Sequence, residues 1–170
     1  MNTVSELVKS LADKYGRERH NLLPILQGVV EQERYLSEHS MKTIAKELDL
    51  PAAEVYGTAT FYSFLEHKKM GKNIIRICKT ISCSMKGSNQ ILLTIEDMLK
   101  IKLGETTPDG VFSLMQTNCL GFCHQAPAML INNDVYTELT PEKVREILTS
   151  YLNKNKEGAE YEQQYSIEKT

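Results

Sequence analysis

The sequence predicts an α/β protein in which an all-helical first part precedes a unit of mixed strands and helices. Apolar residues recur at helical spacing over the first 65 or so residues, where no strand-like run occurs. After a polar, glycine-containing stretch at residues 67–72, short β-branched runs alternate with further helical patterns. We therefore expect three regions: a helical bundle over 1–68, an α/β domain over 72–152 and a polar tail over 153–170.

Four helices are expected in the first part. The first covers residues 4–15, and the second starts at residues 22–24, because the proline there is tolerated in a first turn. Ser40 is expected to cap the third helix. Pro51 is expected to separate it from the fourth, which would run over residues 52–65.

The second part begins with a strand over residues 73–77, in which three isoleucines form the β-branched run of a buried strand. Strands and helices then alternate as far as residue 152. Thr140 is expected to cap the last helix, with Pro141 at its first position. The remaining elements are expected at 84–87 (loop), 90–99 (helix), 111–116 (strand), 128–131 (strand), 132–134 (turn) and 135–136 (strand).

The composition changes at residue 153 to Lys, Glu, Gln and Asn. Such a segment buries too little apolar surface to order itself. We expect the tail over 153–170 to be disordered or bound to a partner.

All four cysteines of the chain fall into two close pairs. Four residues separate Cys78 from Cys83, three separate Cys119 from Cys123, and 35 residues lie between the pairs. Thiolates are preferred ligands of soft metals, and four of them satisfy the irons of a [2Fe–2S] cluster. Loops at two strand ends can bring both pairs to one edge of a sheet. We therefore expect all four cysteines to bind one [2Fe–2S] cluster.

Other uses of the cysteines fit less well. A structural zinc ion usually takes pairs two to four residues apart, so the first pair stands at the edge of that range. Disulfides suit an exported chain, and the N-terminus does not resemble an export signal. The sequence has no Cys-x-x-Cys redox motif, and two close pairs would be unusual for isolated core cysteines. A zinc-stabilised assembly module is the alternative that stays open.

Composition and charge exclude several classes of protein. Hydrophobic residues make up 41% and charged residues 25% of the chain, as in ordinary globular proteins. The formal net charge of −2 gives no reason to expect a nucleic-acid partner. No apolar run approaches the ~20 residues of a membrane span. We expect a cytoplasmic protein without nucleic acid and without membrane insertion.

A rival function attaches to residues 44–56, which look like a helix-turn-helix. A recognition helix contacts bases and phosphates through Arg, Lys, Asn and Gln. None of these occurs from Pro51 to Leu65, where aromatic residues gather instead. We prefer docking to a partner protein for this segment. A redox-sensing, DNA-binding regulator is the second alternative.

Taken together, the motifs of the chain resemble those of the small thioredoxin-like [2Fe–2S] subunit of NADH-linked oxidoreductases. That family includes a subunit of the NADH-dehydrogenase module of complex I. It also includes the gamma subunits of NAD-linked, often electron-bifurcating, hydrogenases and formate dehydrogenases. The matching segments are Gly57-Thr-Ala-Thr-Phe-Tyr-Ser63, the first cysteine pair, Glu105-Thr-Thr-Pro-Asp-Gly110, Cys119-Leu-Gly-Phe-Cys123, Ala126-Pro127 and Leu139-Thr-Pro-Glu-Lys143.

The resemblance implies a helical bundle followed by a thioredoxin-like α/β domain, in which all four cysteines ligate one [2Fe–2S] cluster. It also implies an electron-transfer subunit, without catalytic residues of its own, in a hetero-oligomeric NAD(H)-dependent oxidoreductase. FMN and NAD(H) would then bind a partner flavin subunit, accompanied by further iron–sulfur subunits. In agreement, the chain has no Gly-x-Gly-x-x-Gly phosphate-binding loop.

Two further residues follow from the comparison with this family. His124 departs from its pattern, because glycine commonly follows the last cysteine. A histidine there could donate a hydrogen bond to sulfur or add charge, and either would raise the reduction potential; a side chain that points to solvent is the simpler expectation. Pro127 precedes a strand, as the cis-proline of thioredoxin-like folds does, so we expect a cis peptide bond.

Overall fold

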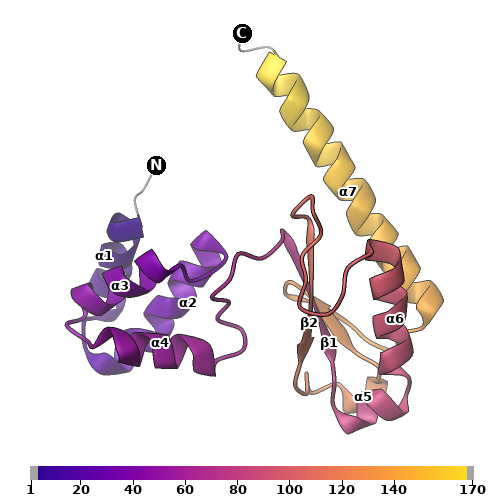
Figure 1. The fold of residues 1–170 in the computed structure, drawn as a ribbon, viewed down its shortest axis with the longest axis horizontal. Coiled ribbons are helices and arrows are strands. Elements are labelled where there is room, and N and C mark those ends of the chain that lie inside the picture. The colour runs from indigo at the N-terminus through magenta and orange to yellow at the C-terminus, as the bar shows by residue number, and fades with distance from the viewer. Residues whose placement is uncertain (1–3, 168–170) are drawn as a thin grey trace. The chain divides into compact units, whose positions relative to one another are not determined.

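The computed structural model describes the backbone of residues 4–167 and the side chains of residues 4–154. The chain divides into two compact units, residues 1–70 and 71–170 (Figure 1). This division falls inside the stretch at 67–72 where the sequence predicted a boundary. Each unit has its own hydrophobic core.

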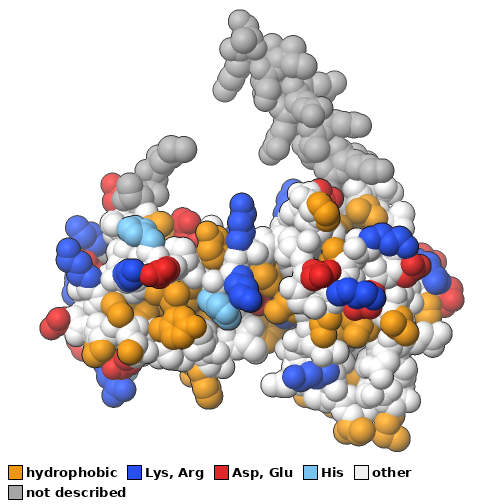
Figure 2. Space-filling view, in the orientation of Figure 1, with side chains coloured by type: hydrophobic (Ala, Val, Ile, Leu, Met, Phe, Trp, Pro, Cys, Tyr) orange, Lys and Arg blue, Asp and Glu red, His pale blue; other side chains and the backbone are white. Residues whose placement is uncertain are grey.

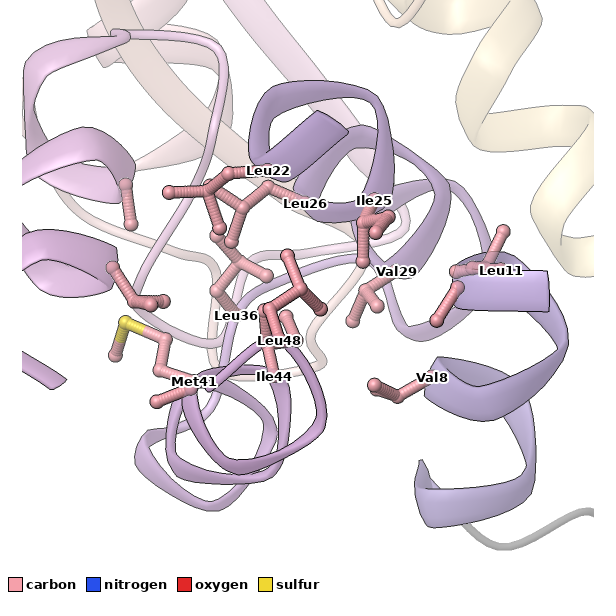
Figure 3. Packing of buried hydrophobic residues seen from close by; sticks show 14 of the residues in the cluster. Val8, Leu11, Leu22, Ile25, Leu26, Val29, Leu36, Met41, Ile44 and Leu48 are labelled. Atoms are coloured by element: carbon pink, nitrogen blue, oxygen red, sulfur yellow. The ribbon is translucent and has the colours of Figure 1, made fainter. Parts of the chain in front are cut away.

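The first unit is a helical bundle. Its elements are α1 (Val4–Tyr15), η1 (Arg19–Asn21), α2 (Leu22–Glu33), α3 (Glu38–Glu47) and α4 (Ala52–Phe61). The apolar stripes of these helices meet in one core, and Figure 3 shows side chains of α1, α2 and α3 directed into it. Gly28 allows α1 and α2 to approach closely, because a Cβ atom there would lie 2.7 Å from Leu11 Cδ2.

The predicted cap of α3 was wrong by three residues. Ser37, not Ser40, is the N-cap, and its Oγ accepts a hydrogen bond from the Ser40 N–H at 3.0 Å. Both residues are serines, so composition alone did not distinguish them. Ser40 is fully buried inside the first turn, where its hydroxyl lies 2.7 Å from that of Ser37.

Helix α4 is shorter than predicted and contributes little to the core. It ends at Phe61 because Tyr62 is extended and a turn from Tyr62 to Leu65 carries Leu65 into the core. Of its ten residues only Val55 and Ala59 are buried. The exposed large side chains of this segment are aromatic: Tyr56, Phe61, Tyr62 and Phe64. We call these four residues the α4 aromatic surface.

The second unit is built on a four-stranded sheet with the order β2-β1-β3-β4. Its strands are β1 (Asn73–Cys78), β2 (Phe112–Thr117), β3 (Met129–Ile131) and β4 (Asp134–Tyr136). Strand β1 is parallel to β2 and antiparallel to β3, and β3 and β4 form a hairpin. The predicted turn of this hairpin is confirmed, with Asn132 at a φ of 55°.

Three helices complete this unit: α5 (Ile81–Met85), α6 (Ser88–Leu99) and α7 (Pro141–Ile167). Helices α6 and α7 pack together against one face of the sheet (Figure 1). The core between them is mainly aliphatic; Phe112 on β2 is buried in it, and Tyr136 and Tyr151 pack against it partly buried. The predicted cap of α7 is confirmed, because Thr140 Oγ1 accepts a hydrogen bond from the Lys143 N–H at 3.3 Å.

Helix α7 continues to Ile167, past residue 152, where the sequence predicted a polar tail. The backbone is therefore helical where the composition led us to expect disorder. Lys, Glu and Gln are good helix formers, so a helix that begins on the sheet can continue through them. Among the helices that the structure describes, none has the length and apolar character that crossing a membrane requires.

Candidate metal centre

The two cysteine pairs meet at one edge of the sheet, as the sequence predicted. Strands β1 and β2 are parallel, so their carboxyl ends lie side by side, with Cys78 opposite Thr117 in the register. Cys119 follows two residues later. The sheet topology therefore brings together pairs that are 35 residues apart in the chain.

The first pair is buried. Cys78 is the last residue of β1, and Cys83 lies in α5; each exposes 1% of its surface. An apolar shell surrounds them, contributed by the segment that carries the second pair: Leu120, Phe122, Ala126 and Ala128. Helix α5 was not predicted, because five residues rich in Ser and Cys show no helical periodicity.

The second pair is exposed at the surface. The Sγ atoms of Cys119 and Cys123 lie 3.3 Å apart, and both residues are free thiols. Between them, Gly121 has a φ of +89°, which a side chain would strain. Its N–H donates to Cys119 Sγ at 3.4 Å. Gly121 thus closes the loop tightly enough for both sulfurs to face the same point.

Two residues between Cys78 and Cys83 in the sequence carry hydroxyl groups that form hydrogen bonds with cysteines of the second pair. Thr80 Oγ1 lies 3.1 Å from Cys78 Sγ and is also hydrogen-bonded to Cys119. The hydroxyl of Ser82 is hydrogen-bonded to Cys123. Sequence reasoning missed both residues, although they stand within the segment Cys78-Lys-Thr-Ile-Ser-Cys83.

Each pair combines one thiol whose pKa is lowered with one whose pKa is raised. Burial raises the pKa of Cys78, but hydrogen bonds from Thr80, Cys83 and the Leu120 N–H outweigh burial, so its pKa is lowered. Burial, followed by the hydrogen bond to Cys78, raises the pKa of Cys83.

The exposed pair behaves in the same way. The Gly121 N–H, followed by the Cys123 thiol, lowers the pKa of Cys119. The hydrogen bond with Cys119, and then the charge of Cys119, raise the pKa of Cys123. Two thiolates this close repel each other, and a cation held between them would remove both the repulsion and the remaining protons.

The two further residues singled out in the sequence lie beside this site. His124 is exposed and belongs to the short helix η2 (Cys123–Gln125), in agreement with a side chain that points to solvent. The peptide bond between Ala126 and Pro127 is cis, which confirms that prediction. Pro127 itself is buried.

A family model for thioredoxin-like [2Fe–2S] ferredoxins matches residues 8–152. The chain belongs to this family. The match includes both units and all four cysteines, so the predicted fold class, a helical part followed by a thioredoxin-like α/β part, is confirmed. The cofactor of this thioredoxin-like ferredoxin is a [2Fe–2S] cluster, as its cysteine spacing predicted.

Relatives of this ferredoxin belong to larger complexes. The chain is 41% identical over 124 residues to a subunit of the NADH-quinone oxidoreductase of Buchnera aphidicola, a match that covers 72% of this chain and 76% of the relative. It is 36% identical over 146 residues to the subunit of the same name from Escherichia coli, covering 86% and 88% of the two chains. Its relatives are thus redox subunits of NADH-dependent oxidoreductase complexes.

A solved structure of an NAD+-reducing [NiFe]-hydrogenase in the air-oxidized state has the same fold, with a TM-score of 0.71 over 83% of this chain. The identity is 21%, and the match covers 24% of the hydrogenase chain, so this likeness establishes the fold alone.

The residues at the sheet edge fit a [2Fe–2S] cluster. They offer four sulfur atoms in two pairs, N–H and hydroxyl donors to sulfur, and an apolar shell on the buried side. A two-iron cluster takes two thiolates per iron, which matches the arrangement of the four cysteines in two pairs.

Proposed function

We propose that this ferredoxin is an electron-transfer subunit whose [2Fe–2S] cluster is ligated by Cys78, Cys83, Cys119 and Cys123. The observation that carries the proposal is the convergence of both cysteine pairs at the carboxyl ends of β1 and β2. When bound, the cluster supplies reversible exchange of one electron. Cys78 and Cys83 would hold its buried side, and Cys119 and Cys123 the side that faces solvent.

The protein residues set the electrostatics of this exchange. The N–H of Gly121 and the hydroxyls of Thr80 and Ser82 point toward sulfur, where extra negative charge arises on reduction. The apolar shell excludes water from the buried pair. In this proposal these groups act on the cluster alone, so the chain would be a non-catalytic subunit of its enzyme.

The partner we propose is a subunit that oxidises NADH with FMN, within a hetero-oligomeric complex that contains further iron–sulfur subunits. The names of the relatives support this choice. The α4 aromatic surface is our candidate for docking that partner, because Phe61 exposes 79% of its surface and no Lys or Arg occurs on α4. The absence of basic residues also disfavours the regulator that would bind DNA.

Metal analysis and EPR test the cluster assignment. The full chain, purified without oxygen, should contain about two iron and two sulfide ions, and reduction with dithionite should produce an S = 1/2 signal. Replacing any one of the four cysteines by serine should remove or alter this signal. One zinc ion per chain, with no signal after reconstitution with iron and sulfide, would contradict the proposal and support the zinc module.

NADH provides the test of the partner. The cluster of the isolated chain should not be reduced by NADH, and adding the flavin subunit of its complex should allow that reduction. A chain whose cluster stays oxidised in the presence of NADH and an active flavin subunit would exclude electron exchange between the two.

A further inference from the structure

The helix between the cysteines of the first pair exposes large apolar side chains. Ile81 and Met85 lie one turn apart on α5 and expose 73% and 81% of their surface. Figure 2 shows hydrophobic side chains gathered over this end of the second unit. Neither residue belongs to a hydrophobic core of the second unit, so packing does not explain why these positions are apolar.

Ile81 stands at the opening of the metal centre. The residue before it, Thr80, is hydrogen-bonded to Cys119, and the residue after it, Ser82, is hydrogen-bonded to Cys123. These two cysteines are the exposed ones. The backbone of Ile81 therefore lies between two residues that contact the exposed cysteines, and its own side chain is exposed to solvent.

Two lysines flank this apolar pair in the chain. Lys79 and Lys86 flank α5, and both are exposed. The segments that carry the cysteines, residues 78–90 and 117–128, contain no Asp or Glu, although the chain as a whole has a net charge of −2. Glu138 is bonded to the second of these segments through its backbone, with its N–H donating to the Gln125 carbonyl at 2.7 Å.

We propose that Ile81 and Met85, with Lys79 and Lys86 at the rim, form a docking surface for the flavin subunit, the cluster-mouth surface. The matching face of that partner would be apolar at its centre and acidic at its rim. This inference rests on the proposed function, because it assigns the flavin subunit to the exposed side of the same cluster.

Two arguments favour this occupant. Electron exchange weakens steeply with distance, so the redox group of the partner must approach the exposed cysteines, which Ile81 adjoins. The four thiolates make the region around the cluster negative, and this charge would repel an acidic partner. The lysines at the rim offset the repulsion and steer the approach of such a partner. A small apolar patch with a charged rim is the usual composition of such an interface.

The test uses the complex of the full chain with its flavin subunit, and compares two double variants with controls. Ile81→Asp with Met85→Asp removes the apolar centre, and Lys79→Glu with Lys86→Glu reverses the rim. The matched controls are Leu93→Asp, at an exposed apolar residue of α6, and Lys9→Glu with Lys46→Glu, at exposed lysines of α1 and α3. Dithionite reduction and EPR of each isolated variant establish that its cluster is intact.

Both cluster-mouth variants should bind the flavin subunit at least about tenfold more weakly than the controls, a loss of about 1.4 kcal/mol, and NADH should reduce their clusters more slowly. The affinity of the wild-type chain for the flavin subunit should fall as the salt concentration rises, and the affinity of the lysine variant should depend less on salt.

Variants that bind as tightly as the controls would overturn this inference and leave the proposed function intact. Self-association through this surface, lost in both double variants, would assign it to a second copy of the chain instead. A wild-type cluster that the flavin subunit cannot reduce would overturn both proposals.

Discussion

The hydroxyl of Thr80 is a side-chain group that contacts both cysteine pairs, since it is bonded to Cys78 and to Cys119. A hydrogen bond to sulfur stabilises negative charge, and the reduced cluster carries one more negative charge than the oxidised cluster. The bond is therefore stronger in the reduced form. Thr80 should accordingly be a determinant of the reduction potential without being a ligand.

Replacing Thr80 by valine should lower the reduction potential of the cluster. Hydrogen bonds to charged groups contribute about 1.5–3 kcal/mol, of which only the difference between the two redox states counts. A tenfold change in a one-electron equilibrium corresponds to about 59 mV, so we expect a fall of about that size. Redox titration followed by EPR measures it. Thr80→Ser keeps the hydroxyl and should restore the potential; equal potentials in all three proteins would contradict the role of Thr80.

The cysteines could be identified from the sequence, whereas their hydrogen-bond donors could not. Cysteine side chains are scarce and chemically distinctive, so their spacing alone indicated a metal centre. Thr80 and Ser82 acquire their roles only because α5 turns their hydroxyls toward the second pair, which is distant in the chain. The identity of a donor thus depends on a short helix that has no periodic pattern.

At the scale of elements, apolar periodicity was informative wherever an element packs against a core. The positions of β1, β2, α6 and most of the bundle followed from it, because burial in these elements repeats along the chain. Boundaries were less predictable. The end of α4 depends on a turn that buries Leu65, and α7 continues through a stretch of good helix formers in which few apolar residues occur to predict it.

Gly57 lies within α4 although the fold does not require a glycine there. A Cβ atom at this position would meet no atom within 4 Å. Gly57→Ala should therefore stabilise the bundle by about 1 kcal/mol, which corresponds to about 4–8 °C in the melting temperature of a unit this size. If the flavin subunit packs closely on the α4 aromatic surface, the same change should weaken the complex.

The control for this prediction is Thr43→Ala on α3, which raises helix propensity away from α4. Thermal denaturation and the affinity for the flavin subunit are measured for both variants. A Gly57→Ala chain that is more stable and binds with unchanged affinity would argue against close packing of the partner on α4.

Tyr151 connects α7 to the β3–β4 hairpin. Its hydroxyl donates to Asp134 Oδ2 at 2.9 Å and lies 3.2 Å from that of Tyr136. Tyr151→Phe should reduce the free energy of unfolding by about 1 kcal/mol. Urea denaturation of the two proteins at neutral pH measures this difference. Similar stabilities would mean that packing alone holds α7 on the hairpin.

This contribution should depend on pH. Burial, and then the neighbouring Tyr136 and Asp134, raise the pKa of Tyr151 in the folded protein. The unfolded chain ionises first, at about pH 10, so the contribution is complete below that pH and is lost as the pH rises above it. The wild-type protein should therefore lose stability above about pH 10 more steeply than Tyr151→Phe, as denaturation curves between about pH 8 and 11 would reveal.

At the scale of the whole molecule, the cluster and the bundle belong to different units. The four cysteines lie in the second unit, and the helical core involves only residues of the first. A ligand stabilises the part of a protein that must be folded to bind it. Loading the cluster should therefore stabilise the sheet unit and leave the bundle unchanged.

Cys83→Ser, which removes one of the proposed ligands, should destabilise the sheet unit selectively. Occupancy at about a thousand times the dissociation constant contributes about 4 kcal/mol, and this is the loss expected relative to the loaded protein. Hydrogen exchange resolves the two units: amides of β1 should lose protection, whereas those of α2 should keep it. Cluster-free wild-type protein is the control for the substitution itself and should resemble the variant. A parallel loss of protection in α2 would mean that the two units unfold cooperatively. Loss of the cluster would then destabilise the helical bundle as well.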